Sequence, residues 1–327
     1  MKGLTASFIV ALAVAWAVTP SVLHLAWRKG ALAHPRDRDV HTEPTPRWGG
    51  IAIYLGVVLA VIFTVTARHI IPGGAGWNWQ LVGILLAGTM IAAIGIIDDV
   101  KDLRALFQII GIVSAGIVLI SFGVRIESLT IPFVEVKPGS WSGVNLAFWP
   151  SVFITLFWVF LVTKTVDAID GLDGLAAGVC AISAATLGLM AAASDQPSVA
   201  LLAAAVAGAC IGFLRYNFNP AKIFMSTVGA QFLGLMLAAI SIVGTFKVAA
   251  AISVAVPVLV LGVPIFDYGI VLMRRFANKA PLTAADRRHL HHRLLDRGLS
   301  QKQAVWVIYG CTVVLCGAAL AIFQMSR

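Results

Sequence analysis

Trp79–Asp99 reads WQLVGILLAGTMIAAIGIIDD, an apolar run that ends on two adjacent carboxylates. A bilayer core of about 30 Å needs about 20 apolar residues in a helix to cross it. The run therefore predicts a transmembrane helix over 79–97, with Asp98 and Asp99 at the membrane boundary. Ionisable residues at such positions are costly and are functional candidates by default.

The rest of the chain contains further long apolar runs. Of its 327 residues 59% are hydrophobic and only 12% are charged, a composition that excludes an ordinary soluble domain. Apolar runs predict ten spans, near 4–27, 49–67, 79–97, 105–122, 148–166, 174–193, 198–214, 226–246, 248–273 and 304–324. We therefore expect an all-α, polytopic integral membrane protein that forms one domain over residues 1–327, with an uncleaved first helix.

The basic residues predict the orientation of these spans. Eighteen of the 24 Lys and Arg residues fall in the connections after odd-numbered spans. By the positive-inside rule these connections are cytoplasmic and both termini are external, as expected in a bacterial inner membrane. The net charge of +9 then reflects topology and attraction to membrane lipid rather than nucleic-acid binding. The long external connection contains Leu129–Val136 followed by Pro138-Gly139, which predicts a short external hairpin.

Acidic residues and histidines gather on the predicted cytoplasmic side. Eleven of the fifteen Asp and Glu residues lie there, and Asp286–Leu294 carries three histidines beside several charges. Carboxylate oxygens are ligands for magnesium, and Arg and His side chains bind phosphate oxygens, so this combination favours a phosphoryl-transfer site. The alternative is that Asp98, Asp99 and Asp170 only cap helix ends, a common role of Asp.

Five separated motifs carry a family resemblance: His41–Gly50 (HTEPTPRWGG), Gly95–Asp99 (GIIDD), Ile169–Leu175 (IDGLDGL), Asn217–Met225 (NFNPAKIFM) and Asp286–Leu295 (DRRHLHHRLL). In this order they resemble the polyprenyl-phosphate N-acetylhexosamine-1-phosphate transferases of glycosyltransferase family 4. The resemblance implies that polyprenyl phosphate, such as undecaprenyl phosphate, attacks the β-phosphorus of a UDP-N-acetylhexosamine and releases UMP. The short histidine motif favours N-acetylglucosamine as the sugar, in a pathway that starts a cell-envelope polysaccharide such as lipopolysaccharide O-antigen.

The resemblance also implies roles for individual residues and a divalent cation, Mg²⁺ or alternatively Mn²⁺. It makes Asp98, Asp99, Asp170 and His291 catalytic, and assigns the metal to the three aspartates. It makes the following residues substrate-binding: Arg47, Lys164, Asp173, Asn217, Lys222, His289, His292 and Arg293. The expected partners are polyprenyl phosphate, the UDP-sugar and membrane lipid, and both a monomer and a homodimer remain open.

The sequence departs from the family pattern at charged positions. The family's Phe-Met-Gly-Asp reads Phe224–Thr227 here, so Thr227 replaces an expected magnesium ligand. Lys164 and Asp167 replace asparagines, and Glu43 and Gln108 stand where basic residues are common. Two interpretations follow: an active transferase with weakened metal affinity in which Asp167 is a substitute ligand, or a catalytically impaired homologue that binds substrate or a partner transferase. Charges are nearly absent from the span centres, which argues against a transporter.

Overall fold

The computed structural model describes residues 2–33, 35, 43–69, 75–129, 144–244, 252–277 and 289–325. The helices are α1 (Lys2–Lys29), α2 (Gly49–Thr66), the 3₁₀ turn η1 (Ala67–His69), α3 (Trp79–Lys101), α4 (Ala105–Ser121), α5 (Phe148–Ile169), α6 (Leu175–Ala193), α7 (Pro197–Asn217), α8 (Ser226–Val243), α9 (Ile252–Val260), α10 (Gly262–Ala277), α11 (Leu290–Asp296) and α12 (Gln301–Met325). The strands are β1 (Leu32–Ala33), β2 (Thr45–Pro46), β3 (Ser128–Leu129) and β4 (Val144–Asn145).

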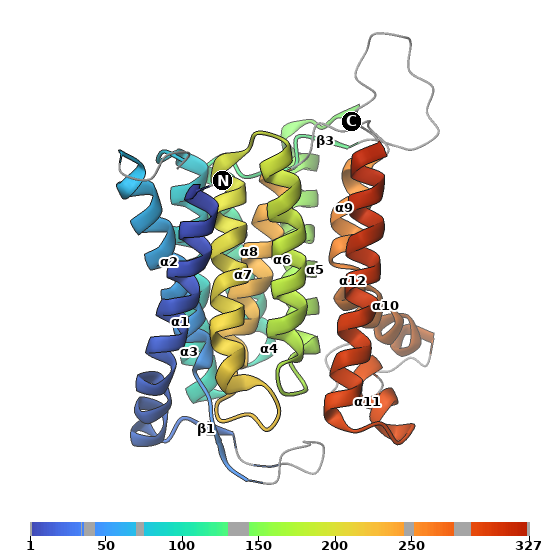
Figure 1. Cartoon of the computed structure of the whole chain (residues 1–327). Coiled ribbons are helices and arrows are strands. Elements are labelled where there is room, and N and C mark those ends of the chain that lie inside the picture. The colour runs from blue at the N-terminus through green and yellow to red at the C-terminus, as the bar shows by residue number, and fades with distance from the viewer. Residues whose placement is uncertain are drawn as a thin grey trace.

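The long helices run side by side in one bundle, with α8 at its centre between α2, α3 and α5 (Figure 1). Eight of them, α1, α2, α3, α5, α6, α7, α8 and α12, are long and apolar enough to cross a membrane. The 17-residue α4 is apolar and slightly shorter. The chain is therefore a polytopic, all-α membrane protein, as the sequence predicts. Both chain ends lie at the same end of the bundle, and β1 and α11 lie at the other (Figure 1).

The ninth predicted span, 248–273, is not one continuous helix. The described part breaks at Leu261 into the nine-residue α9 and the sixteen-residue α10, which leaves the bundle sideways (Figure 1). Pro264 explains the break, because proline has no N–H with which to bond the carbonyl of Val260. The Ser183 hydroxyl donates to that carbonyl over 2.9 Å instead. A side-chain donor of this kind allows a helix to break within a membrane protein.

Two short strand pairs lie at opposite ends of the bundle. β1 pairs with β2 antiparallel near the start of α2, and β3 pairs with β4 antiparallel at the opposite end. The predicted external hairpin covers Leu129–Val136, and most of it lies outside the described residues. Its flanks are joined by the β3–β4 pair, so residues 128–129 and 144–145 come together.

The orientation can be tested by placing single cysteines at the two ends of the bundle. We expect Ser128→Cys, beside the connection predicted to be external, to react with an impermeant thiol reagent in intact cells, and Ser300→Cys, between α11 and α12, to be protected. Both positions are exposed, so burial does not decide the outcome. The exposed native Cys311 is replaced by serine in both variants. Labelling of Ser300→Cys before cell lysis would contradict the predicted orientation.

Candidate active site

The amino end of α8 is where the carboxylates of α3 meet the rest of the bundle. Asp99 Oδ1 accepts hydrogen bonds from Ser226 Oγ over 2.5 Å and from the Thr227 N–H over 3.2 Å. The first N–H groups of a helix have no partner within it, so Asp99 caps α8. This carboxylate lies at the carboxyl end of its own helix, where the helix dipole disfavours it. Its position is explained by α8 and not by α3.

Two glycines allow the close approach that this cap requires. A Cβ atom at Gly95 of α3 would lie 2.6 Å from the Cα of Val228, and one at Gly50 of α2 would lie 2.1 Å from the nitrogen of Gly229. Any side chain at either position would displace the backbone of α8. The amino end of α8 is therefore fixed against α2 and α3 by direct backbone packing.

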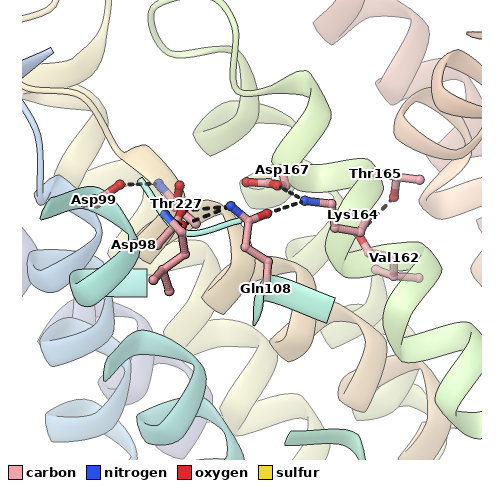
Figure 2. Close-up of polar contacts among 9 residues, drawn as sticks. Asp98, Asp99, Gln108, Val162, Lys164, Thr165, Asp167 and Thr227 are labelled. Carbon is pink, nitrogen blue, oxygen red and sulfur yellow. Dashed lines mark hydrogen bonds and ion pairs between the residues drawn. The ribbon is translucent and has the colours of Figure 1, made fainter. Parts of the chain in front are cut away.

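Asp98 belongs to a chain of polar side chains that crosses from α3 to α5 (Figure 2). Its Oδ1 accepts from the N–H of Leu103 over 3.0 Å, and Gln108 Nε2 donates to both carboxyl oxygens over 3.0 and 3.1 Å. Lys164 Nζ donates to Gln108 Oε1 over 3.2 Å and forms an ion pair with Asp167 over 2.5 Å. The Asp98 carboxylate is thus held rigidly, and Lys164 is the cation at the far end of the network.

The same ion pair determines what Asp167 can do. Asp167 is predicted above as a substitute metal ligand, but its Oδ2 is engaged by Lys164. A cation could bind there only after this pair opened, and the ammonium of Lys164 would repel it. Lys164 and Asp167 together add no net charge to the site.

Asp170 directly follows α5 and adds a third carboxyl group. Burial raises its pKa to about 8, and the negative charges of Asp167 and Asp99 act in the same direction. A backbone hydrogen bond from Ser226 opposes the shift. At neutral pH the Asp170 carboxyl is therefore protonated, unless a bound cation displaces the proton.

One buried oxygen in this cluster has no partner. Asp99 Oδ2 is buried and accepts no hydrogen bond in the described part of the protein. A buried carboxylate oxygen is costly when it is unpaired, and a cation would satisfy it. The described residues contain no group of three or more His, Cys, Asp or Glu side chains that could hold a metal ion by themselves. Mg²⁺ commonly needs only one or two carboxylates when substrate phosphates and water complete its shell. Asp99 and Asp170 fit this second arrangement.

Of the Asp286–Leu295 motif, the structure describes residues 289–295. They contain the three histidines of the motif: His289 directly precedes α11, and His291 and His292 lie in it. The rings of His289 and His291 are stacked with centroids 5.7 Å apart, and the His291 and His292 centroids are 4.3 Å apart. A Cβ atom at Gly171 would lie 2.5 Å from His291 Nε2. The structure therefore brings the histidine cluster against the loop that carries Asp170, as the predicted phosphoryl-transfer site requires.

His291 is a neutral ring in this environment. Its pKa is lowered to about 3, mainly by burial and in smaller part by the neighbouring His292 and His289, while Asp267 acts in the opposite direction. It can donate or accept a hydrogen bond at physiological pH, but it cannot supply the positive charge that phosphate binding was expected to draw from the cluster.

Asp173 and Asn217 hold the loop between α7 and α8. Asp173 Oδ2 accepts from Asn219 Nδ2 over 2.9 Å and from the Ala221 N–H over 3.0 Å. The buried Asn217 accepts from the Gly174 N–H over 3.1 Å and donates to the Ile223 carbonyl over 2.9 Å. Both side chains, predicted to bind substrate, thus form hydrogen bonds within the protein that hold the loop leading into α8.

The other predicted substrate-binding residues are cations around the same end of the bundle. Arg47 Nη1 donates to the Asp99 carbonyl over 3.3 Å and lies 3.7 Å from Asp102 Oδ1. Lys222 is exposed, and Arg293 is half-buried in α11. Arg47 is thus placed beside the carboxylates, while Lys222 faces solvent.

Sequence reasoning missed Asp267. This buried residue of α10 accepts hydrogen bonds from His289 Nδ1 and from the Leu290 N–H, over 2.8 and 2.6 Å. A signal for it was available, because Asp267 is the one acidic residue inside a predicted span, and ionisable residues in membrane spans are usually functional. Gln108 was noted only as a departure from the family, yet it links Asp98 to Lys164.

Comparison with known proteins places the chain in a family. Residues 81–245 match the family described as glycosyl transferase family 4. A protein of Bacillus subtilis named probable undecaprenyl-phosphate N-acetylglucosaminyl 1-phosphate transferase is 35% identical over 309 residues, 94% of this chain and 82% of that protein. The chain belongs to glycosyl transferase family 4.

Other relatives in the family have related names. Decaprenyl-phosphate N-acetylglucosaminephosphotransferase of Mycobacterium tuberculosis is 36% identical over 347 residues, covering 100% of this chain and 83% of the relative. Phospho-N-acetylmuramoyl-pentapeptide-transferase of Synechococcus is 30% identical over 315 residues, covering 90% and 84% respectively. The family resemblance predicted from the five motifs is confirmed.

The contact between Gly171 and His291 can be tested by adding one methyl group. We expect Gly171→Ala to lower the stability of the detergent-solubilised protein by about 1–3 kcal/mol, because the new Cβ forces the buried ring to move. Gly310→Ala is the matched control, since nothing lies within 4 Å of its added Cβ. Thermal melting of both variants provides the measurement. Equal melting temperatures would show that His291 does not pack on this loop.

Proposed function

We propose that this protein transfers N-acetylhexosamine 1-phosphate, with N-acetylglucosamine as the sugar, from a UDP-sugar to polyprenyl phosphate and releases UMP. The observation that carries the proposal is the convergence of Asp98, Asp99 and Asp170 with the histidine cluster at one end of a membrane bundle. A lipid phosphate and a water-soluble nucleotide can meet only at such a boundary. The names of the relatives support the same reaction. The product would start a cell-envelope polysaccharide at the bacterial inner membrane.

The chemistry makes modest demands on a general base. An oxygen of the lipid phosphate forms a bond to the β-phosphorus, the bond from that phosphorus to the bridging oxygen breaks, and the electron pair leaves with UMP. The second pKa of a phosphate monoester is about 6, so the attacking oxygen is already ionised at neutral pH. The larger obstacle is repulsion between two anionic phosphates, which positioned cations must offset.

The chain provides cations on two sides of the carboxylates. Lys164 lies at the end of the Gln108 link to Asp98, and Arg47 lies beside Asp99. We assign both to phosphate oxygens, with Arg293 of α11 as a third. Asp98 holds the Gln108–Lys164 network in place and does not act as a base, because Leu103 and Gln108 already occupy its oxygens.

A divalent cation fits the remaining groups. Asp99, through its unpartnered Oδ2, and Asp170 would hold Mg²⁺, which would neutralise diphosphate charge when bound. Thr227, at the position where the family pattern has a magnesium-binding aspartate, offers only a hydroxyl, a weaker ligand for a hard cation. We therefore expect weaker magnesium binding than a site with three carboxylates would give.

The second candidate function is a catalytically impaired homologue that still binds a nucleotide-sugar or a partner transferase. Two observations favour it: Thr227 removes a carboxylate, and the Lys164–Asp167 pair occupies the substitute. The two functions differ in turnover, so one assay separates them.

We expect purified protein in detergent, given undecaprenyl phosphate and a panel of UDP-sugars, to release UMP. Asp99→Asn should lower turnover by about 100-fold, because the amide keeps the Oδ1 cap on α8 but removes the charge that faces the cation. Asp296→Asn, an exposed carboxylate at the end of α11, is the control and should retain parental turnover. Absence of UMP release from the parent, with UDP-sugar binding preserved, would identify the impaired homologue.

Magnesium binding should depend on pH through Asp170. Its pKa is raised to about 8, so below that pH a proton competes with the cation, and above it the competition ends. We expect the apparent Mg²⁺ affinity to rise about tenfold per pH unit up to pH 8 and then level off. Isothermal titration in buffers of different ionisation enthalpy would also detect the released proton. Asp170→Asn should remove this pH dependence, and a pH-independent affinity in the parent would exclude Asp170 as a ligand.

A further inference from the structure

α10 has two chemically different faces. Phe266, Ile270 and Met273 are spaced for one side of the helix and are exposed. Asp267 and Val271 are spaced for the other side and are buried. An apolar outer face beside membrane-spanning helices is suited to lipid, while the inner face places one carboxylate inside the protein.

Both oxygens of that carboxylate contact the start of α11, within the histidine motif. Asp267 Oδ2 lies 2.8 Å from His289 Nδ1, and Oδ1 accepts from the Leu290 N–H over 2.6 Å. The second bond caps α11, a helix of only seven residues that has little stability of its own. The first bond fixes the orientation of the His289 ring.

The bond between Asp267 and His289 Nδ1 also determines which nitrogen of the His289 ring carries the proton. An ionised carboxylate can only accept, so His289 Nδ1 must donate to Asp267. In the neutral ring this leaves Nε2 as the nitrogen with a free lone pair. An Asp that orients a histidine in this way also sets its tautomer, and loss of the tautomer is far more costly for catalysis than for folding.

His289 links Asp267 to the loop that carries Asp170. Its ring is stacked on His291 with an interplanar angle of 5°, and His291 Nε2 lies against Gly171, next to Asp170. The path from α10 to the carboxylates therefore runs through Asp267, His289 and His291. α11 otherwise packs mainly on α12.

We propose that Asp267 is the positioning residue of the histidine cluster: it holds α11 against the Asp170 loop and fixes the His289 tautomer. Only the kinetic consequence rests on the proposed transferase function. The structural consequence holds whether or not the protein turns over.

Histidine modification tests the structural consequence. Full-length protein in detergent is treated with diethylpyrocarbonate, and the modified histidines are quantified by mass spectrometry with the exposed His24 as internal reference. In Asp267→Ala we expect His289 and His291 to react about tenfold faster than in the parent, because the segment loses its anchor and opens locally. Asp296→Asn should behave as the parent. Unchanged protection in Asp267→Ala overturns the proposal.

The variant Asp267→Asn separates the two roles proposed for Asp267, holding α11 in place and fixing the His289 tautomer. Its amide oxygen can still accept from Leu290, so His291 should stay protected, but its NH₂ group would face Nδ1 and favour the opposite tautomer. We expect kcat for UMP release to fall by about 100-fold or more while KM for the UDP-sugar stays near the parental value. Asp267→Glu, which keeps an acceptor-only group, should recover part of the loss. Parental kcat in Asp267→Asn would refute the tautomer role. If the parent itself is inactive, the proposed function fails, and the modification experiment still decides whether Asp267 positions the cluster.

Discussion

The hydrogen bonds from Ser226 and Thr227 to Asp99 Oδ1 are the interaction on which the site depends. They join the carboxyl end of α3 to the amino end of α8, and they use one carboxylate oxygen while leaving the other unpartnered. Ser226 has φ +61, a backbone conformation that glycine adopts at little cost and serine does not. Its hydroxyl bond to Asp99 offsets part of that cost. A position at which the backbone favours glycine has thus become a source of polar contact with the carboxylate.

The charges near Asp98 depend on the hydrogen-bond network that connects it through Gln108 to Lys164 and Asp167 of α5. Lys164 is balanced by Asp167 and linked by Gln108 to Asp98, so a positive group and a negative group enter the site together. A partly buried ion pair of this kind contributes little to stability, but loss of one partner leaves an uncompensated charge. The departures at 108, 164 and 167 therefore act as one unit and not as three independent substitutions. Thr227 stands outside this unit, and its missing carboxylate is the change that the network does not compensate.

Much of the fold could be predicted from the sequence, because hydrophobic run length decides which segments cross a bilayer. The motif residues also converge at one end, as their order along the chain suggested. What could not be predicted is the direction of individual side chains. Asp173 and Asn217 lie in motifs yet bond the protein backbone, because a loop that carries a site must satisfy its own buried polar groups. Asp167 was predicted as a substitute metal ligand, but its carboxylate forms an ion pair with Lys164, one helical turn away on the same helix.

The break at Leu261 shows why run length alone misplaced Asp267. A continuous helix over 248–273 would set this carboxylate at membrane depth, where it would need a partner that the apolar sequence nearby does not supply. Pro264 and the Ser183 hydroxyl end α9 after Val260, and α10 turns out of the bundle. The turn carries Asp267 to His289 at the boundary where the carboxylates lie. Composition cannot distinguish a broken helix from a straight one, and proline alone cannot either, because α9 continues through Pro257. At the break, Pro264 removes the N–H that would bond the Val260 carbonyl, and the Ser183 hydroxyl is the donor that replaces it.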